Sequence, residues 1–168
     1  MKIIFYWTTD ESLDVLIELS KKNEILGVIS KKSPTVTKRR NIKVSKILEF
    51  SSDKFPVFQP EILDKTFEKQ IKALNPDLAV VVAYGKILKK SLIEIPKYGT
   101  INIHPSLLPK YRGPSPVQNT ILNQDKQTGF TIIQMDEGID SGNILYQSKK
   151  FNLSLNEKYS ELLKLLFN

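Results

Sequence analysis

Hydrophobic residues along the chain form either short unbroken runs or patterns that recur every three or four positions. The run Leu78–Ala83 is unbroken and rich in β-branched residues, which is typical of a strand covered on both faces. Ile62–Leu74 has apolar residues at 63, 67, 71 and 74, the spacing of a helix. The strands predicted in this way are Lys2–Tyr6, Ile25–Ile29, Pro56–Phe58, Leu78–Ala83, Thr100–His104, Phe130–Met135 and Ile144–Tyr146. Helices are predicted at Val44–Leu48, Ile62–Leu74 and Val117–Leu122. Two more are predicted to follow capping residues, one at Thr9 or Asp10 and one at Asn156.

Strands and helices therefore alternate, which favours an α/β protein with a largely parallel sheet and right-handed crossovers. Ligands of such sheets collect at the carboxyl ends of the strands. The chain has no GxGxxG after its first strand and no GxxxxGK[ST], because Gly85-Lys86 is followed by Ile87. A dinucleotide-binding dehydrogenase and a P-loop NTPase are thus disfavoured.

Composition narrows the chemistry further. A length of 168 residues suits one domain, and 40% apolar residues suffice for a core. The absence of Cys excludes disulfides, thiol nucleophiles and zinc-thiolate sites, and the single His excludes sites with two imidazoles. No apolar run reaches the ~20 residues of a membrane helix. We expect a cytoplasmic protein without a membrane partner.

The charge excess is local. The formal net charge is +7, and Lys31–Lys46 contains seven basic residues and no acidic one. Such a patch suits a polyanion, although a solvated lysine-rich loop has the same composition.

Polar residues gather where the predicted strand Thr100–His104 ends. Asn102 and His104 are two positions apart, so their side chains point to the same face, opposite Ile101 and Ile103. Histidine titrates near neutral pH, and an asparagine amide can stabilise an oxyanion. The pair is either catalytic or a structural support for the proline-rich loop that follows.

Two loops follow these residues. In the loop Pro105–Pro114, Arg112 either clamps an anion or ties the loop to backbone carbonyls. The loop Asp136–Gly142 carries three carboxylates near two glycines, which suggests a metal loop, an acid/base site or a simple hairpin turn. Its spacing does not match an EF-hand.

Motifs in both loops resemble those of the folate-dependent formyltransferases. The matching segments are Asn102–Gly113 and Thr128–Gly142, which contain Asn-x-His, Ser-Leu-Leu-Pro and a downstream Asp. Within this superfamily the chain is most similar to the methionyl-tRNA formyltransferases, through Arg112–Gln118, Gln134–Gly138, Val81–Leu88 and Pro56–Pro60. The resemblance implies the formyltransferase fold, a Rossmann-like, mostly parallel twisted sheet with helices on both faces.

The resemblance also implies a reaction. The formyl group of 10-formyltetrahydrofolate passes to the α-amino group of methionine on initiator tRNA, without a metal. Asn102 and His104 stabilise the developing oxyanion, and Asp140 positions His104 and shuttles the amine proton. We expect the enzyme to be a monomer.

A folate site is implied by the same motifs, with a cis peptide bond at Leu108–Pro109. Its implied contacts are Tyr84, Lys86, Ile87, Leu88, Ser106, Leu107, Leu108, Pro109, Asp136, Glu137, Gly138 and Ile139.

The basic patch lies where the family's tRNA enzymes have an insertion that contacts the acceptor stem. The residues implied to contact tRNA are Lys38, Arg39, Arg40 and Lys43.

The resemblance covers essentially the whole chain. By this comparison residues 1–168 form the catalytic domain, cut short in its last helix, and the family's C-terminal β-barrel is absent. The alternatives are another folate-dependent N-formyltransferase, acting on a nucleotide-linked amino sugar or glycinamide ribonucleotide, and an inactive folate- or tRNA-binding remnant.

Overall fold

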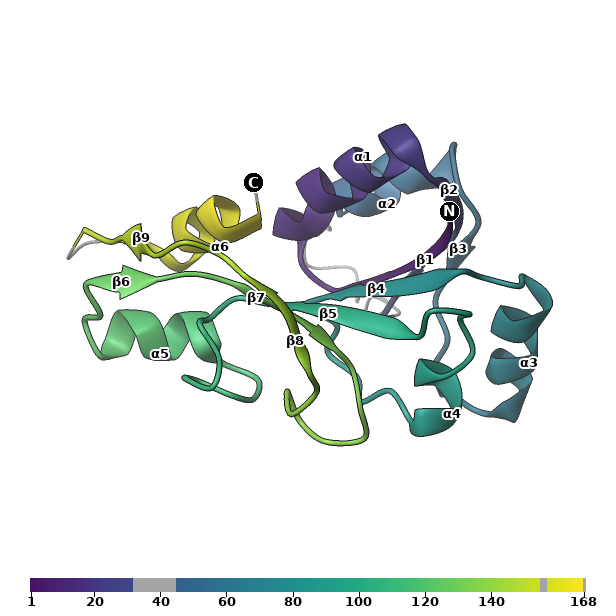
Figure 1. The fold of residues 1–168 in the computed structure, drawn as a ribbon. Helices are drawn as coiled ribbons and strands as arrows, with labels where there is room; N and C mark the ends of the chain where they lie inside the picture. Colours follow the sequence, from purple (N-terminus) through teal and green to yellow (C-terminus); the bar gives the residue numbers. More distant parts are fainter. Residues whose placement is uncertain (32–44, 155–156, 168) are drawn as a thin grey trace.

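A twisted seven-stranded sheet forms the centre of the molecule (Figure 1). A computed structural model describes residues 1–31, 45–154 and 157–167. The strand order is β3-β2-β1-β4-β5-β7-β8. The strands are β1 Lys2–Trp7, β2 Glu24–Ser30, β3 Val57–Phe58, β4 Leu78–Val82, β5 Thr100–His104, β7 Thr131–Gln134 and β8 Ile144–Gln147. Strands β1 to β5 pair in parallel, whereas β7 and β8 are antiparallel additions. The predicted α/β architecture with a mostly parallel sheet is confirmed.

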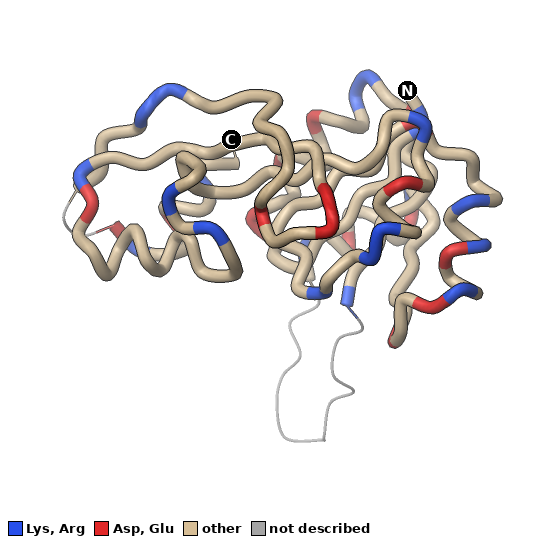
Figure 2. Tube along the Cα trace, turned by 60° about the horizontal axis from the view of Figure 1, so that its bottom comes forward, with Lys and Arg blue, Asp and Glu red and all other residues tan. Residues whose placement is uncertain are grey.

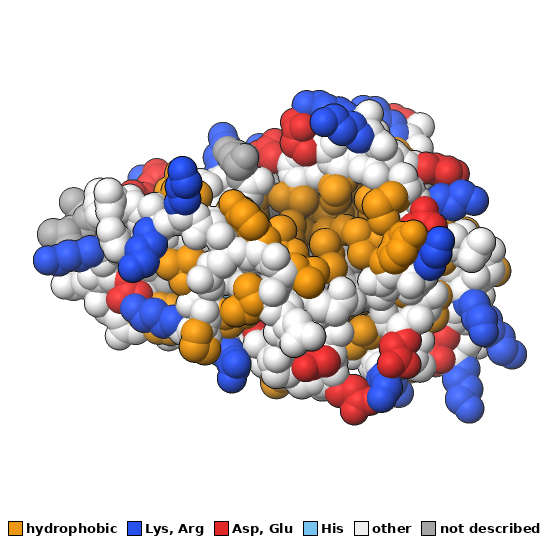
Figure 3. Space-filling model, viewed as in Figure 1, with side chains coloured by type: hydrophobic (Ala, Val, Ile, Leu, Met, Phe, Trp, Pro, Cys, Tyr) orange, Lys and Arg blue, Asp and Glu red, His pale blue; other side chains and the backbone are white. Residues whose placement is uncertain are grey.

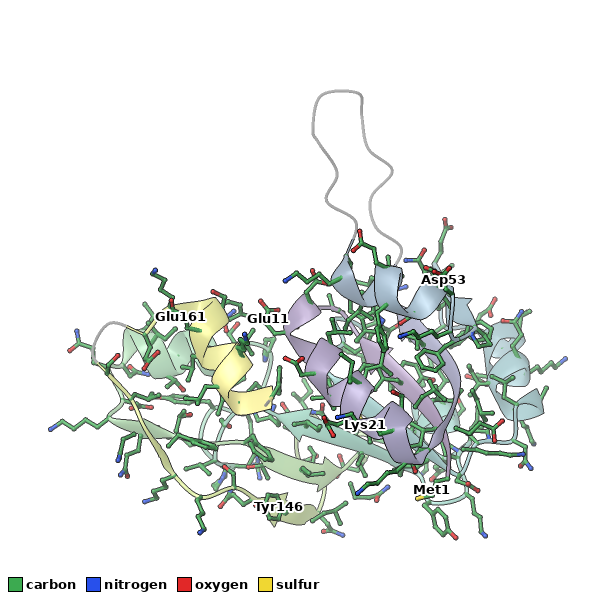
Figure 4. The ribbon with its side chains drawn as sticks, turned by 90° about the horizontal axis from the view of Figure 1, so that it is seen from above. Met1, Glu11, Lys21, Asp53, Tyr146 and Glu161 are labelled. Carbon is green, nitrogen blue, oxygen red and sulfur yellow. The ribbon has the colours of Figure 1, made fainter. Side chains whose placement is uncertain are left out.

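Helices cover both faces of the sheet. One face carries α1 Leu13–Lys22, α2 Lys46–Ser52, α5 Pro116–Leu122 and α6 Tyr159–Phe167. The other face carries α3 Lys65–Ala73 and α4 Lys90–Ile93. From above, α6 lies beside the start of α1, near Glu11, and α2 lies on the far side of α1 (Figure 4). None of the helices among the described residues is long and apolar enough to cross a membrane.

Each central strand contributes to two hydrophobic cores because its side chains alternate between the faces. In β1, Phe5 and Trp7 enter the first core with α1, α2, α5 and α6, whereas Ile4 and Tyr6 enter the second with α3 and α4. Burial of one such side chain contributes about 1.5–3 kcal/mol to the free energy of unfolding. The unbroken hydrophobic runs of β1 and β4 follow from this coverage on both faces.

The first core is not fully covered. Figure 3 shows hydrophobic side chains around a hollow that lies below α1 in this view. The partly buried hydrophobic residues that α1, β4 and β5 add to this core include Val15, Leu19, Leu78, Ile101 and Ile103.

Several element boundaries differ from the predictions. Helix α3 begins at Lys65 rather than Ile62, because Asp64 caps it and Leu63 is buried from outside the helix. Thr9, one of the two predicted caps, stands at the N-cap position of a 3₁₀ turn, Asp10–Ser12, that precedes α1, but its side chain makes no capping bond. Asp10 accepts a hydrogen bond from Ser45 instead.

Three further elements were not predicted, because they are too short to show a period. They are α4 and the paired strands β6 Gln127–Thr128 and β9 Phe151–Asn152. The predicted cap at Asn156 lies outside the described residues.

The Asp64 cap gives a test of this local structure. Its carboxylate accepts hydrogen bonds from the backbone N–H groups of Thr66 and Phe67, at 3.0 and 2.9 Å. Asp64→Ala removes both, so we expect urea denaturation to show a loss of about 1 kcal/mol in unfolding free energy. Lys69→Ala, an exposed change in the same helix, is the control. Equal effects of the two changes would contradict the capping role.

Candidate active site

Strand β5 presents Asn102 and His104 on one face of the sheet. Ile101 and Ile103 pack against the first core on the opposite face, as the alternation predicts. The strand lies between parallel β4 and antiparallel β7, so its backbone is held on both sides. His104 is 4% exposed, and its imidazole is therefore shielded from bulk water.

The Asp140 carboxylate joins the two side chains. Asn102 Nδ2 donates to Oδ1 at 3.2 Å, and His104 Nδ1 lies 3.4 Å from Oδ2. The backbone N–H of Gly113 also donates to Oδ2, at 2.9 Å. Asp140 adopts a left-handed conformation with φ +49°, which aspartate tolerates better than most residues do. Asn102, His104 and Asp140, the predicted catalytic residues, thus converge at the carboxyl end of β5.

The second nitrogen of His104 fixes the protonation pattern of the ring. Nε2 lies 2.9 Å from the backbone carbonyl oxygen of Tyr111. A carbonyl oxygen can only accept, so Nε2 carries the hydrogen of this bond. Nδ1 is consequently the nitrogen that can exchange a proton, and it faces Asp140.

The loop that carries Asp140 is shaped by short contacts of its own. Asp136 Oδ1 accepts from the Gly138 N–H and the Ser141 hydroxyl, at 2.9 and 2.7 Å. At Gly142 a Cβ atom would stand 1.7 Å from the Gln134 carbonyl oxygen, so only glycine fits this position. Figure 2 shows the loop coming forward beside α4, and Lys90 of that helix pairs with Glu137 at 3.1 Å.

The three carboxylates of this loop thus have separate partners. Among the described residues, no group of three or more His, Asp or Glu side chains is placed to hold a metal ion. The loop joins the antiparallel strands β7 and β8, as the hairpin alternative predicts, and Asp140 is the one of its three carboxylates that meets the histidine.

The proline-rich loop after β5 is held by one buried hydroxyl. Thr131 Oγ1 donates to the Ser106 carbonyl at 2.6 Å and accepts from the Leu108 N–H at 3.0 Å and from Gln147 Nε2 at 3.1 Å. The Leu108–Pro109 peptide bond is cis, as the sequence resemblance implies. Arg112 is exposed and has no hydrogen bond or ion pair with the part of the chain that the structure describes.

The residues predicted to bind folate fall in two groups. Tyr84 and Leu88 pack with Met135 on the second core, and the Lys90–Glu137 pair ties this region to the Asp136–Ile139 segment. Ser106–Pro109 is tied to β7 and β8 instead.

Lys86, another predicted folate contact, has partners within the protein. Its ammonium donates hydrogen bonds to the carbonyl oxygens of Pro60 and Glu61, each at 2.7 Å.

The first group combines exposed apolar side chains with a buried phenol. Ile87 and Ile139 are 81% and 65% exposed. The Tyr84 hydroxyl is buried and has no hydrogen-bond partner among the described residues. Burial raises the pKa of Tyr84 to about 12, so the phenol is neutral at physiological pH.

Some of the predicted positions lie outside the described residues, and two backbone contacts of the site were not predicted. Lys38, Arg39, Arg40 and Lys43, the predicted tRNA contacts, lie in the undescribed segment 32–44. The Tyr111 carbonyl and the Gly113 N–H were missed, because backbone groups leave no signal in residue types. The glycine at 113, with φ +99°, was the available hint of a sharp turn.

A family model described as formyl transferase matches residues 1–162. The chain belongs to the formyl transferase family. It is 42% identical over 165 residues to a methionyl-tRNA formyltransferase of Clostridioides difficile. The matched segment covers 96% of this chain and 53% of that protein. It is 43% identical over 169 residues to the enzyme of the same name from Borreliella afzelii, covering 99% and 53%. The chain thus spans about half the length of the curated relatives it matches.

Solved structures share the fold at lower sequence identity. A phosphoribosylglycinamide formyltransferase from Bacillus halodurans has a TM-score of 0.80 and 22% identity, covering 99% of this chain and 87% of that one. A formyltetrahydrofolate deformylase from Pseudomonas syringae has a TM-score of 0.74 and 19% identity, covering 99% and 58%. The formyltransferase fold expected from the sequence is confirmed.

The contribution of the buried Thr131 hydroxyl to stability can be tested by an isosteric change. Thr131→Val leaves the Leu108 N–H and the Ser106 carbonyl without this partner, so we expect a loss of about 2 kcal/mol in unfolding free energy. Thr120→Val is the matched control, because buried Thr120 donates only to the Pro116 carbonyl within its own helix. Chemical denaturation measures both, and equal losses would refute the special role of Thr131.

Proposed function

We propose that this chain is the catalytic domain of an enzyme that formylates the α-amino group of methionine on initiator tRNA. The donor is 10-formyltetrahydrofolate, used as a co-substrate. The observation that carries the proposal is the convergence of Asn102 and His104 on Asp140. It occurs in a chain 42% identical to a methionyl-tRNA formyltransferase over nearly all its length.

Asn102 is suited to stabilise the oxygen that gains negative charge when the amine attacks the formyl carbon. Its Nδ2 carries two hydrogens, of which one is donated to Asp140. The second N–H is left for the oxyanion. A preorganised donor of this kind needs no rearrangement as charge develops, and it is worth about 10²–10³ in rate.

The His104–Asp140 pair is suited to handle the proton that the amine loses. Asp140 is the acceptor, and its position is fixed by Asn102 and by the Gly113 N–H. His104 Nδ1 faces the carboxylate, so a proton can be shared between them and returned to the leaving nitrogen. The low exposure of His104 strengthens this electrostatic coupling.

The folate site is assigned to residues from the segments around β4, β5 and β7. Tyr84 offers a hydroxyl with no hydrogen-bond partner in the described part of the chain, and Ile87 and Ile139 offer exposed apolar surface. The Asp136–Ile139 backbone is assigned to a pterin edge. Leu88 and Ser106–Pro109 are assigned to the same site because the motif resemblance includes them. The co-substrate supplies the activated formyl group when it is bound.

The tRNA is assigned to the basic segment that contains Lys38, Arg39, Arg40 and Lys43. The similarity favours this acceptor over glycinamide ribonucleotide, because identity to the solved phosphoribosylglycinamide enzymes is 22% or lower. We expect the enzyme to act in the cytoplasm as a monomer.

Acceptor specificity is the direct test of the proposal. The chain is offered charged initiator tRNA, glycinamide ribonucleotide or a nucleotide-linked amino sugar, each with 10-formyltetrahydrofolate. We expect formyl transfer to methionyl-tRNA. Transfer to another acceptor alone, or folate binding without any transfer, would contradict it.

Removal of each catalytic side chain should lower the rate severely while the fold remains. We expect Asn102→Ala, His104→Ala and Asp140→Ala each to reduce formyl transfer by about 10²-fold or more, because oxyanion stabilisation or proton transfer is lost. Asp53→Ala, an exposed carboxylate at the end of α2, serves as the control. Circular dichroism checks folding, and a near-wild-type rate in any of the three would refute the role of that residue.

Changes in the basic segment should weaken the use of tRNA and leave the use of folate unaffected. We expect Arg39→Ala with Arg40→Ala to raise the KM for methionyl-tRNA, to leave the KM for folate unchanged and to reduce the salt slope of tRNA binding by roughly 2. The control is Lys149→Ala with Lys150→Ala, which removes the same charge from another exposed site. A parallel rise in both KM values would show that the segment does not bind tRNA.

A further inference from the structure

We propose that Tyr111 and Asp125 are positioning residues that fix the orientation and tautomer of His104 through the Tyr111 backbone carbonyl. The inference rests on the proposed function, since it gives His104 the role of handling a proton. Its principal measurement is spectroscopic, however, and does not depend on catalysis.

A single short turn holds both members of the His104–Asp140 pair. The Tyr111 carbonyl oxygen lies 2.9 Å from His104 Nε2, and the Gly113 N–H donates to Asp140 Oδ2 at 2.9 Å. Both turn residues have positive φ angles, +58° for Tyr111 and +99° for Gly113. Glycine adopts this conformation readily, but tyrosine does so only when its surroundings impose it.

The side chain of Tyr111 supplies that constraint. Its hydroxyl donates to Asp125 Oδ2 at 2.8 Å and accepts from Asn123 Nδ2 at 2.9 Å. The Asp125 N–H donates to the Thr120 carbonyl at 3.1 Å, which attaches the carboxylate to the end of α5. A continuous chain of contacts therefore runs from α5 through Asp125 and Tyr111 to His104.

Asp125 remains an anion in this setting. Burial by itself raises its pKa, but hydrogen bonds from Lys110 and Tyr111 outweigh burial and lower the pKa below its ordinary value. Lys110 Nζ reaches the same oxygen at 2.7 Å. A charged acceptor strengthens the bond from the Tyr111 hydroxyl.

The consequence for His104 is a choice of tautomer. While the Tyr111 carbonyl is held at Nε2, the neutral ring carries its hydrogen there and presents the Nδ1 lone pair to Asp140. If the turn relaxes, the Asp140 carboxylate beside Nδ1 is the partner that remains, and the ring shifts toward the tautomer protonated at Nδ1.

The chain offers a direct readout because His104 is its only histidine. The imidazole ¹⁵N signals therefore need no assignment to a residue, and they report which ring nitrogen is protonated. We expect the wild-type protein to show a protonated Nε2. A neutral ring protonated at Nδ1 would overturn the proposal without any variant.

Two variants test the anchor, with one matched control. We expect Tyr111→Phe and Asp125→Ala to move the His104 signals toward the tautomer protonated at Nδ1 and to lower kcat about tenfold with little change in the KM for folate. Tyr98→Phe removes a phenol from an exposed position and should leave both unchanged. Folded variants with wild-type imidazole spectra would refute the positioning role. A tautomer shift in a protein that transfers no formyl group would support the anchor and contradict the proposed function alone.

Discussion

The Asp140 carboxylate, in the loop after β7, makes hydrogen bonds or ion-pair contacts to two other segments of the sequence. Its two oxygens meet Asn102 and His104 of β5 and the N–H of Gly113 in the following loop. The site therefore exists only if three placements agree: the register of β5, the turn at residues 111–113 and the loop after β7. Most other contacts of this region serve one of these placements.

The sheet provides the first placement and the loops provide the others. Covering helices bury the hydrophobic side chains of β5 on one face, which forces Asn102 and His104 to the other. The antiparallel strand β7 ends beside Ile101, toward the amino end of β5, so the loop after β7 folds back toward His104 and brings Asp140 to it. Within that loop, the close approach of Gly142 to Gln134 sets how sharply the chain returns.

Much of this arrangement is readable in the sequence, but not all of it. The two-residue spacing predicts that Asn102 and His104 share a face, and the motif resemblance brings in Asp140. The partners of the pair are backbone groups of Tyr111 and Gly113, which every residue possesses, so only the turn geometry reveals them. The sequence predicts the start of helix α3 too early. Leu63 fits the helical period and is buried, but it lies in the loop before Asp64, the residue that caps the helix.

The buried hydroxyl of Tyr84 has a consequence for selectivity. A buried polar group without a partner costs about 1–3 kcal/mol of folding free energy. A ligand that supplies a hydrogen bond there recovers this cost, whereas an isosteric ligand that is apolar at the same place does not. Because the phenol, with a pKa of about 12, stays neutral, this discrimination is constant over the physiological pH range. With Tyr84 in the proposed folate site, this cost becomes a preference among the ligands of that site.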